Sequence, residues 1–170
     1  RAELKLPAII GDHMVLQQGK PTSIFGKATA GAEVTLEFSG QKVTAKSDSE
    51  GIWSAELPAM PVNATGQTLK VSGGGESVAI DDVLVGEVWL CGGQSNMEWP
   101  MSRSFEPAAD IAAATNELIR VFKVAKNRMG SPTTVIKSGW ELCTPQSIEG
   151  FSAVGYYFGR DLQSARKVPI

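Results

Sequence analysis

A serine that lies two positions after a pair of glycines is the best candidate for a catalytic residue in this chain. Ser95 comes after Gly92-Gly93-Gln94, and residues 83–91 before them are mostly apolar and β-branched. A serine hydroxyl attacks a carbonyl when a base accepts its proton and N–H donors stabilise the oxyanion. A tight turn after a strand exposes the hydroxyl and aims backbone N–H groups at the same point. Ser95 is therefore a candidate nucleophile, and its own N–H is a candidate oxyanion donor.

The pattern around Ser95 also allows a purely structural role. Serine is common as the N-cap of a helix that follows a strand, and local pattern alone leaves both roles open. The apolar run at 83–91 predicts a strand buried on both faces, as in a parallel sheet covered by helices. Open α/β sheets bind ligands at the carboxyl ends of such strands, so this prediction places Ser95 at a ligand site.

The sequence offers no histidine that we expect to act as the catalytic base for Ser95. The single histidine, His13, lies in a Gly-Asp-His-Met turn far from Ser95 in sequence, and we expect a surface or turn role for it. No group of His, Cys and Asp has metal-ligand spacing, so we expect neither a metal nor an organic cofactor. Cys91 and Cys143 are the only cysteines, and the sequence leaves open whether they are bonded.

Composition excludes several classes of protein. The 170 residues are 42% hydrophobic and 20% charged, with a net charge of −2, which is typical of a globular protein. There is no run of Lys or Arg, so we expect no nucleic-acid partner. The apolar runs are too short to cross a bilayer, so no membrane partner is expected. The first residues, 1–5, lack the apolar core of a signal peptide.

Two regions with different patterns position these residues. Residues 1–82 contain short alternating stretches separated by turn residues, which predict an antiparallel β-sandwich with Trp53 buried in its core. Its strands are expected at 14–17, 22–25, 33–38, 41–45, 51–57 and 68–72, with a two-residue hairpin loop at Ser39-Gly40.

Residues 83–170 switch to a strand-helix-strand order. After the strand at 83–91, we expect a helix at 107–117, a strand at 118–124, a loop at 126–138 and a helix at 148–165. Val168-Pro169-Ile170 is expected to begin another strand. Strands joined through a helix form a parallel pair with a right-handed crossover. The overall prediction is a mixed fold with two domains, 1–82 and 83–170.

The block around Ser95 resembles that of a known family. Gly-Gln-Ser-Asn-Met, preceded by Val-Gly-Glu-Val-Trp-Leu-Cys-Gly and followed by Glu-Trp-Pro-Met, is similar to the nucleophile block of the sialate O-acetylesterase family. These are carbohydrate esterases of the SGNH-hydrolase superfamily. Residues 6–19 and 151–162 are also similar to the family. The block is not the Gly-x-Ser-x-Gly elbow of α/β-hydrolases, because Met97 replaces the second glycine.

The resemblance implies a site and a fold. It makes Ser95 the nucleophile and an oxyanion donor, and it places Gln94, Asn96, Met97 and Trp99 near the substrate. It implies an N-terminal β-sandwich followed by the first part of an α/β, flavodoxin-like SGNH domain that is incomplete in this chain. The catalytic histidine and its acidic partner are then expected beyond Ile170. Residues 1–170 alone are therefore expected to be inactive.

The resemblance also implies an activity. The expected reaction removes acetyl groups from sugar hydroxyls through an acyl-serine intermediate, as in a sialate 9-O-acetylesterase. The alternatives are an acetylxylan or plant-polysaccharide acetylesterase and a non-catalytic carbohydrate-binding β-sandwich. The expected partners are an O-acetylated carbohydrate and the remainder of the hydrolase domain. The expected location is periplasmic or secreted.

Overall fold

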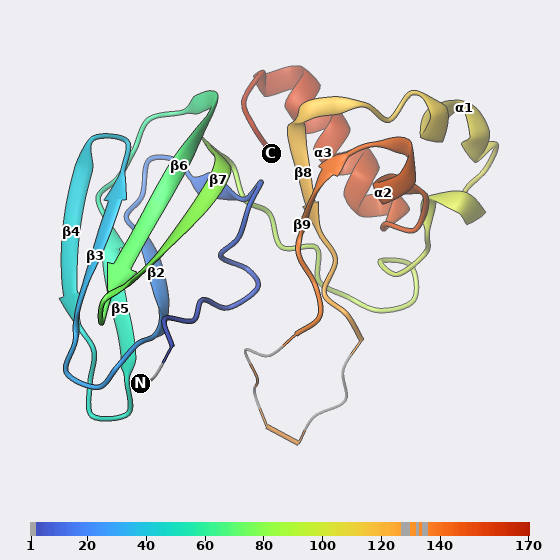
Figure 1. The fold of residues 1–170 in the computed structure, drawn as a ribbon. Helices are drawn as coiled ribbons and strands as arrows, with labels where there is room; N and C mark the ends of the chain where they lie inside the picture. The colour runs from blue at the N-terminus through green and yellow to red at the C-terminus, as the bar shows by residue number, and fades with distance from the viewer. Residues whose placement is uncertain (1–2, 127–129, 132, 134–135) are drawn as a thin grey trace.

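The structure, a computed structural model, is mostly sheet with few helices (Figure 1). It describes residues 3–126, 130–131, 133 and 136–170. Five strands form a mixed sheet in the order β1-β7-β6-β3-β4, and β2 pairs with β5 in antiparallel fashion. The strands are β1 (Val15–Gln17), β2 (Thr22–Lys27), β3 (Glu33–Phe38), β4 (Gln41–Lys46), β5 (Ile52–Leu57), β6 (Asn63–Gly73) and β7 (Glu76–Gly86).

Alternating side chains bury one face of β3, as the sequence predicts. Val34 and Leu36 are 0% exposed and Phe38 is 2% exposed, because successive side chains of a strand point to opposite faces. These residues pack in one apolar core with Trp53, so the predicted burial of Trp53 is confirmed.

The hairpin between β3 and β4 is also confirmed. Phe38 pairs with Gln41, which leaves Ser39 and Gly40 as the two loop residues. Both have positive φ, 52° and 75°. Two left-handed residues give the type I′ turn whose twist matches the flanking strands.

The strand predicted at 83–91 is wrong in its position. Residues 83–86 are the end of β7, which pairs with β6 in antiparallel fashion and with β1 in parallel fashion. They therefore belong to the same sheet as β3, and the N-terminal strands are not all antiparallel as predicted. Val83 and Val85 are buried in the N-terminal core, whereas residues 88–91 are exposed and outside any strand. The apolar run predicts burial correctly only up to Glu87, because no described strand flanks residues 88–91.

The C-terminal part contains two more strands and three short helical elements before its longest helix. They are η1 (Met101–Arg103), α1 (Pro107–Ala112), β8 (Asn116–Phe122), β9 (Trp140–Cys143), α2 (Pro145–Glu149) and α3 (Ala153–Arg166). β8 pairs with β9 in antiparallel fashion and bonds Ile170, not residues 83–91, along its other edge, so the predicted parallel pairing with 83–91 is wrong. The missed strand β9 takes one edge of β8, where Trp140 packs on Phe122 with ring centroids 5.5 Å apart. Much of the predicted loop at 126–138 lies outside the described residues.

The single helix predicted at 148–165 is two helices. Gly150 caps α2, and the Ser152 hydroxyl caps α3 by accepting a hydrogen bond from the Gly155 N–H at 3.1 Å. A serine N-cap starts a new helix because it satisfies a first-turn donor that has no partner inside the helix. The apolar stripe alone did not indicate this break.

The segment after α3 has the hydrogen bonds of a parallel strand. The Ile170 N–H donates to the Leu118 carbonyl at 2.8 Å, and the Arg120 N–H donates back to the Ile170 carbonyl at 2.9 Å. On the other side, the Glu87 N–H donates to the Pro169 carbonyl at 2.9 Å. The extended segment expected at Val168–Ile170 therefore lies between β8 and the residue that follows β7.

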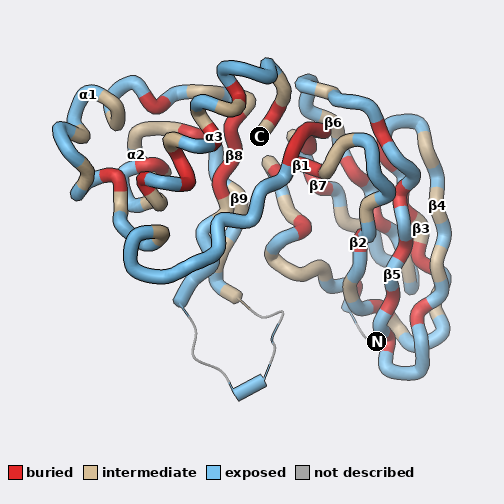
Figure 2. Tube along the Cα trace, turned by 180° about the vertical axis from the view of Figure 1, so that it is seen from behind, coloured by how far each residue is buried: buried red, intermediate tan, exposed pale blue. Residues whose placement is uncertain are grey.

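Most buried hydrophobic side chains of the described residues fall into two clusters. One contains residues between Leu4 and Val85, and the other contains residues between Met101 and Tyr156. Figure 2 shows them as separate buried regions in the strand-rich half and in the helical half. The predicted domain division after residue 82 stays a prediction, although Val83 and Val85 pack in the first cluster.

Candidate functional site

Ser95 lies in an exposed turn. The Met97 N–H donates to the Gln94 carbonyl at 2.7 Å, so Ser95 and Asn96 are the two central residues of a four-residue turn. Among the described residues, nothing accepts from the Ser95 N–H or bonds its hydroxyl. The next helical element begins only at Met101, so Ser95 is not a helix N-cap and that interpretation is wrong.

Ser95 belongs to a stretch that we call the serine segment, residues 88–100. This segment contains no helix and no paired strand. Its far end is fastened to the start of α3, because the Ala153 N–H donates to the Trp99 carbonyl at 2.9 Å. Just beyond it, the Met101 N–H donates to the Phe151 carbonyl at 3.0 Å. The exposed turn is therefore held against a helix rather than free at both ends.

The four residues expected near the substrate surround Ser95, and two of them have structural partners. The Ser152 hydroxyl donates to the Met97 sulfur at 3.4 Å, and the Trp99 indole N–H donates to the Arg103 carbonyl at 2.7 Å. Gln94 and Asn96 are exposed. Their role toward a substrate stays a prediction for Gln94, Asn96, Met97 and Trp99 alike.

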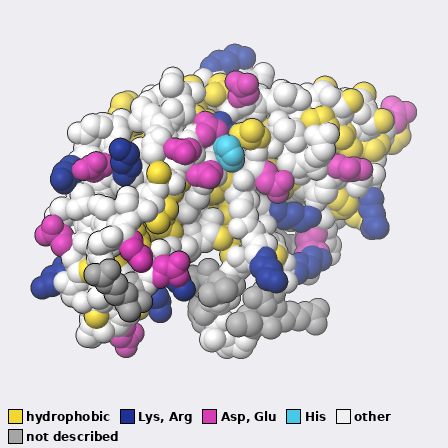
Figure 3. All heavy atoms as spheres, viewed as in Figure 1, with side chains coloured by type: hydrophobic (Ala, Val, Ile, Leu, Met, Phe, Trp, Pro, Cys, Tyr) yellow, Lys and Arg dark blue, Asp and Glu magenta, His cyan; other side chains and the backbone are white. Residues whose placement is uncertain are grey.

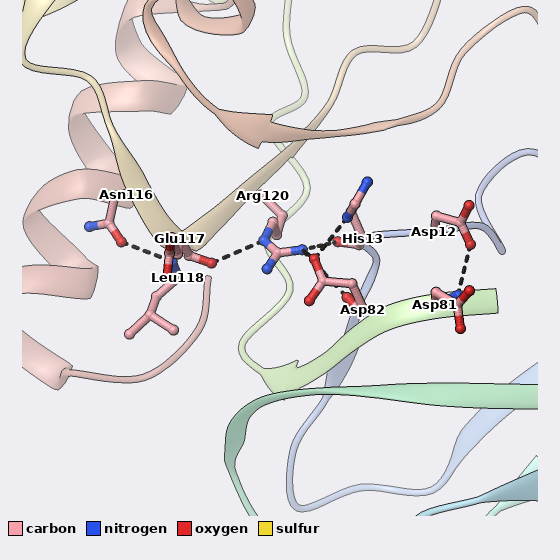
Figure 4. A network of polar contacts seen from close by, with 8 residues as sticks. All are labelled: Asp12, His13, Asp81, Asp82, Asn116, Glu117, Leu118 and Arg120. Carbon is pink, nitrogen blue, oxygen red and sulfur yellow. Dashed lines mark hydrogen bonds and ion pairs between the residues drawn. The ribbon is translucent and has the colours of Figure 1, made fainter.

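His13 is engaged in a polar network with residues of β7 and β8 (Figure 4). Its Nδ1 lies 2.8 Å from Asp82 Oδ2, and the Arg120 guanidinium donates to the same carboxylate oxygen at 2.7 Å. Figure 3 shows the single histidine at the surface with acidic side chains close by. The expected surface or turn position of His13 is confirmed.

Arg120 is a buried charge that the sequence did not reveal. It comes from β8, its side chain is 4% exposed, and its Nε donates to the Glu117 carbonyl at 3.1 Å. Its partner Asp82 lies within β7 and has a φ of 55°. A buried guanidinium needs such an anionic partner, and only the folded chain brings these two residues together.

The surroundings of Asp82 lower the pKa of its carboxyl. Burial alone would raise this pKa, because it disfavours the charged form. The hydrogen bonds from Arg120 and His13, together with the charges of both residues, outweigh burial and leave the pKa below its ordinary value. Asp82 is therefore held in its charged form by its two neighbours.

Both cysteines are free thiols in this structure. Cys91 belongs to the exposed serine segment, and Cys143 is buried. Burial raises the pKa of each thiol above its ordinary value, and for Cys143 a backbone hydrogen bond opposes this in part. The question that the sequence left open is thus answered in favour of free cysteines.

A groove of about 1060 Å³ separates the N-terminal strands from the part that contains β8 and α3. Gly92, Gly93 and Met97 of the serine segment line it, whereas Ser95 is not among the lining residues. The remaining lining includes the aromatic side chains Phe25, Trp89, Phe122, Trp140 and Phe158. Apolar side chains are visible between the two halves in Figure 3.

Within residues 3–126 and the described residues after them, no three His, Cys, Asp or Glu side chains gather as a metal site would require. None of the helices described has the length and apolar character needed to cross a bilayer.

The chain is similar to known esterases along almost its whole length. It is 30% identical to the sialate O-acetylesterase of Rattus norvegicus and 28% identical to those of Mus musculus and Homo sapiens, in each case over 98% of this chain. It covers 34% to 35% of these relatives, so it spans about a third of their length. No protein-family model matches the chain.

A solved structure agrees with these relatives. The crystal structure of a carbohydrate acetylesterase from Xanthomonas citri superposes on 99% of this chain with a TM-score of 0.93 and 36% identity, and the match covers 39% of that enzyme. The relatives by sequence and the neighbour by structure are all esterases. The resemblance of this chain to the sialate O-acetylesterase family, which the residues around Ser95 indicate, is therefore confirmed.

Proposed function

We propose that this chain supplies the serine nucleophile of a carbohydrate O-acetylesterase. The observation that carries the proposal is Ser95 itself, an exposed serine in an anchored turn of a chain similar to sialate O-acetylesterases. Because the chain spans about a third of those relatives, the activity is assigned to a complete protein that contains these residues.

In the proposed reaction, the Ser95 hydroxyl attacks the acetyl carbonyl of an O-acetylated sugar. A base accepts the serine proton, and the Ser95 N–H stabilises the oxyanion of the tetrahedral intermediate. The intermediate collapses to an acetyl-serine and releases the sugar hydroxyl, which receives the proton from the base. Water, activated by the same base, then hydrolyses the acetyl-serine to acetate and free Ser95.

The base is proposed to come from outside these residues. His13, the single histidine, is bound to Asp82 and lies outside the groove lining. We assign the base and its acidic partner to the remainder of an SGNH-type, flavodoxin-like domain that follows an N-terminal β-sandwich. The groove between the two parts supports this, because its lining includes the exposed apolar side chains of Trp89, Leu90 and Phe158, and such surfaces favour association with further protein.

The proposed substrate is a 9-O-acetylated sialic acid, and the proposed location is periplasmic or secreted. The names of the sequence relatives support the substrate, while the Xanthomonas citri neighbour supports only an acetylated carbohydrate in general. No metal or organic cofactor takes part in the proposed reaction.

The test compares p-nitrophenyl acetate hydrolysis by three samples: residues 1–170, the complete protein, and the complete protein with Ser95→Ala. We expect Ser95→Ala to lower kcat at least ~10³-fold, because the covalent route disappears. Residues 1–170 should not exceed background, since general-base help worth roughly 10²–10⁴-fold is missing.

Ser102→Ala is the matched control. Ser102 is also exposed, and its replacement removes the same hydroxyl group at a position outside the turn. It should keep full activity. Labelling of Ser95 by a fluorophosphonate, located by mass spectrometry, would identify the nucleophile directly. Activity that survives Ser95→Ala would refute the proposal. Comparison of 9-O-acetylated sialic acid with acetylated xylan as substrates then decides between the two carbohydrate classes.

A further inference from the structure

We propose that Glu87 is a positioning residue that fastens the start of the serine segment to the far end of α3. The role toward catalysis rests on the proposed function of Ser95, whereas the contacts are properties of the fold. Glu87 directly precedes the segment and is only 8% exposed. A carboxylate this deeply buried needs donors around it, because its charge is costly without them.

The Glu87 carboxylate is in contact with three side chains from three parts of the chain. Its Oε1 lies 2.7 Å from Arg166 Nε at the end of α3, and Oε2 accepts a hydrogen bond from the Trp89 indole N–H at 3.2 Å. The Gln18 amide, next to β1, donates to Oε1 at 3.4 Å. Glu87 thus joins the N-terminal strands, the serine segment and α3 at one point.

The backbone around Glu87 is fixed as well. The Glu87 N–H donates to the Pro169 carbonyl at 2.9 Å, and the Val88 N–H donates to the Gln17 side-chain carbonyl at 2.9 Å. A Cβ at Gly86 would overlap the Pro169 carbonyl oxygen, so the two backbones approach too closely for any side chain there. The origin of the serine segment therefore has little freedom to move.

The two ends of the serine segment are held at opposite ends of the same helix. Glu87 contacts Arg166 at the last turn of α3, and Trp99 contacts Ala153 at its first turn. A helix of the 14 residues of α3 is about 21 Å long. Between these anchors, the Trp89 ring packs edge-on against Phe158 with centroids 5.1 Å apart. The serine segment is therefore attached to α3 near both ends of the helix.

Polar contacts, rather than burial, must fix the first part of the segment. Trp89 is 54% exposed and Leu90 is 93% exposed, so little apolar area is removed from water there. The hydrogen bond between Glu87 and the Trp89 indole connects the buried carboxylate to the exposed first part of the segment. Loss of this bond should loosen the turn that presents Ser95 without unfolding the two cores.

The experiment uses the complete protein with Glu87→Gln, Trp89→Phe and the double variant. Glutamine keeps the size of the side chain but replaces one acceptor with an NH₂ donor, so it cannot accept from both Arg166 and Trp89. Phenylalanine removes the indole N–H, retains an aromatic ring beside Phe158, and leaves the Glu87–Arg166 pair intact. Glu37→Gln is the matched control, because Glu37 forms an exposed pair with Lys42.

Hydrogen–deuterium exchange of the 88–99 peptide is the structural readout, and kcat and KM are the catalytic ones. We expect Glu87→Gln to speed exchange in this peptide at least about tenfold, with peptides of β3 and β6 unchanged. We also expect a loss of at least about tenfold in kcat with KM within about threefold, because a misplaced nucleophile impairs chemistry more than binding. The double variant should show the same exchange rate and kcat as Glu87→Gln, because both changes break the same Glu87–Trp89 hydrogen bond.

Three results would overturn the proposal. Unchanged exchange at 88–99 would show that Glu87 does not anchor the segment, and faster exchange in all peptides would show a general effect on stability. Faster exchange with unchanged kcat would refute the positioning role. If Glu87→Gln does not fold, Trp89→Phe carries the same test. Activity that survives Ser95→Ala would refute the proposed function of Ser95. The exchange result would still test whether Glu87 anchors the segment, because exchange does not depend on catalysis.

Discussion

The Arg120 guanidinium donates to the Asp82 carboxylate at 2.7 Å and thereby ties β8 to the end of the N-terminal sheet. Arg120 Nη1 also lies within 3.3–3.4 Å of the backbone carbonyls of His13 and Asp82. His13 and Asp82 both have positive φ, 66° and 55°. A buried arginine thus binds the backbone carbonyls of two residues in the left-handed conformation, which is costly for residues other than glycine.

Asp82→Asn should lower the free energy of unfolding by about 2–4 kcal/mol. The change leaves the buried Arg120 without its anionic partner, which is destabilising, and solvent offsets part of this cost because the Asp82 side chain is 37% exposed. Asparagine is the suitable replacement because it tolerates the positive φ at this position. Urea unfolding measures the effect. Glu37→Gln, which breaks an exposed pair, should change stability by less than about 1 kcal/mol, and equal effects of both variants would contradict the prediction.

The stabilisation by Asp82 should depend on pH. Its pKa in the folded chain lies below the ordinary value of 3.8, since Arg120 and His13 outweigh the effect of burial. A lowered pKa stabilises the fold fully above the pKa of the unfolded chain, and this stabilisation is lost as pH falls through the lower, folded value. The stability difference between wild type and Asp82→Asn should therefore be larger at pH 6 than at pH 3. A difference that grows on acidification would show that the sign is wrong.

Gly86→Ala and Gly92→Ala should differ although they make the same chemical change. A Cβ at Gly86 would overlap backbone atoms of Pro169, whereas at Gly92 it would meet no atom within 4 Å. We expect Gly86→Ala to cost about 1–3 kcal/mol, as for overpacking in a core, and Gly92→Ala to lie within about 0.5 kcal/mol of wild type. Thermal unfolding of the two variants makes the comparison. Equal midpoints would mean that Pro169 does not approach β7 as closely as described.

His13→Asn should leave the kcat of the complete enzyme within about threefold of wild type. His13 is bound to Asp82 and does not line the groove, and asparagine tolerates the φ of 66° at this position. An ester-hydrolysis assay at saturating substrate is the measurement. A loss of a hundredfold or more in a folded variant would make His13 the base and overturn the assignment of that role to another part of the protein.

The sequence by itself determined the strands that alternate and the identity of the candidate nucleophile. Val34, Leu36 and Phe38 face the core because a period of two is a local property of an extended chain. Ser39-Gly40 forms its hairpin because two residues with positive φ suffice to turn the chain. Ser95 was chosen from its neighbours in sequence, and its role as nucleophile stays a prediction.

The tertiary structure alone decided which segments pair and which charges meet. The apolar run at 83–91 is ambiguous because hydrophobicity does not say which neighbours will cover it, and the fold covers it only as far as Glu87. Asp82 and Arg120 are 38 residues apart, and Glu87 and Arg166 are also distant in sequence, so no periodic pattern connects them. Such pairs form only when the chain brings two elements together, because a charge can be buried only beside the partner that compensates it.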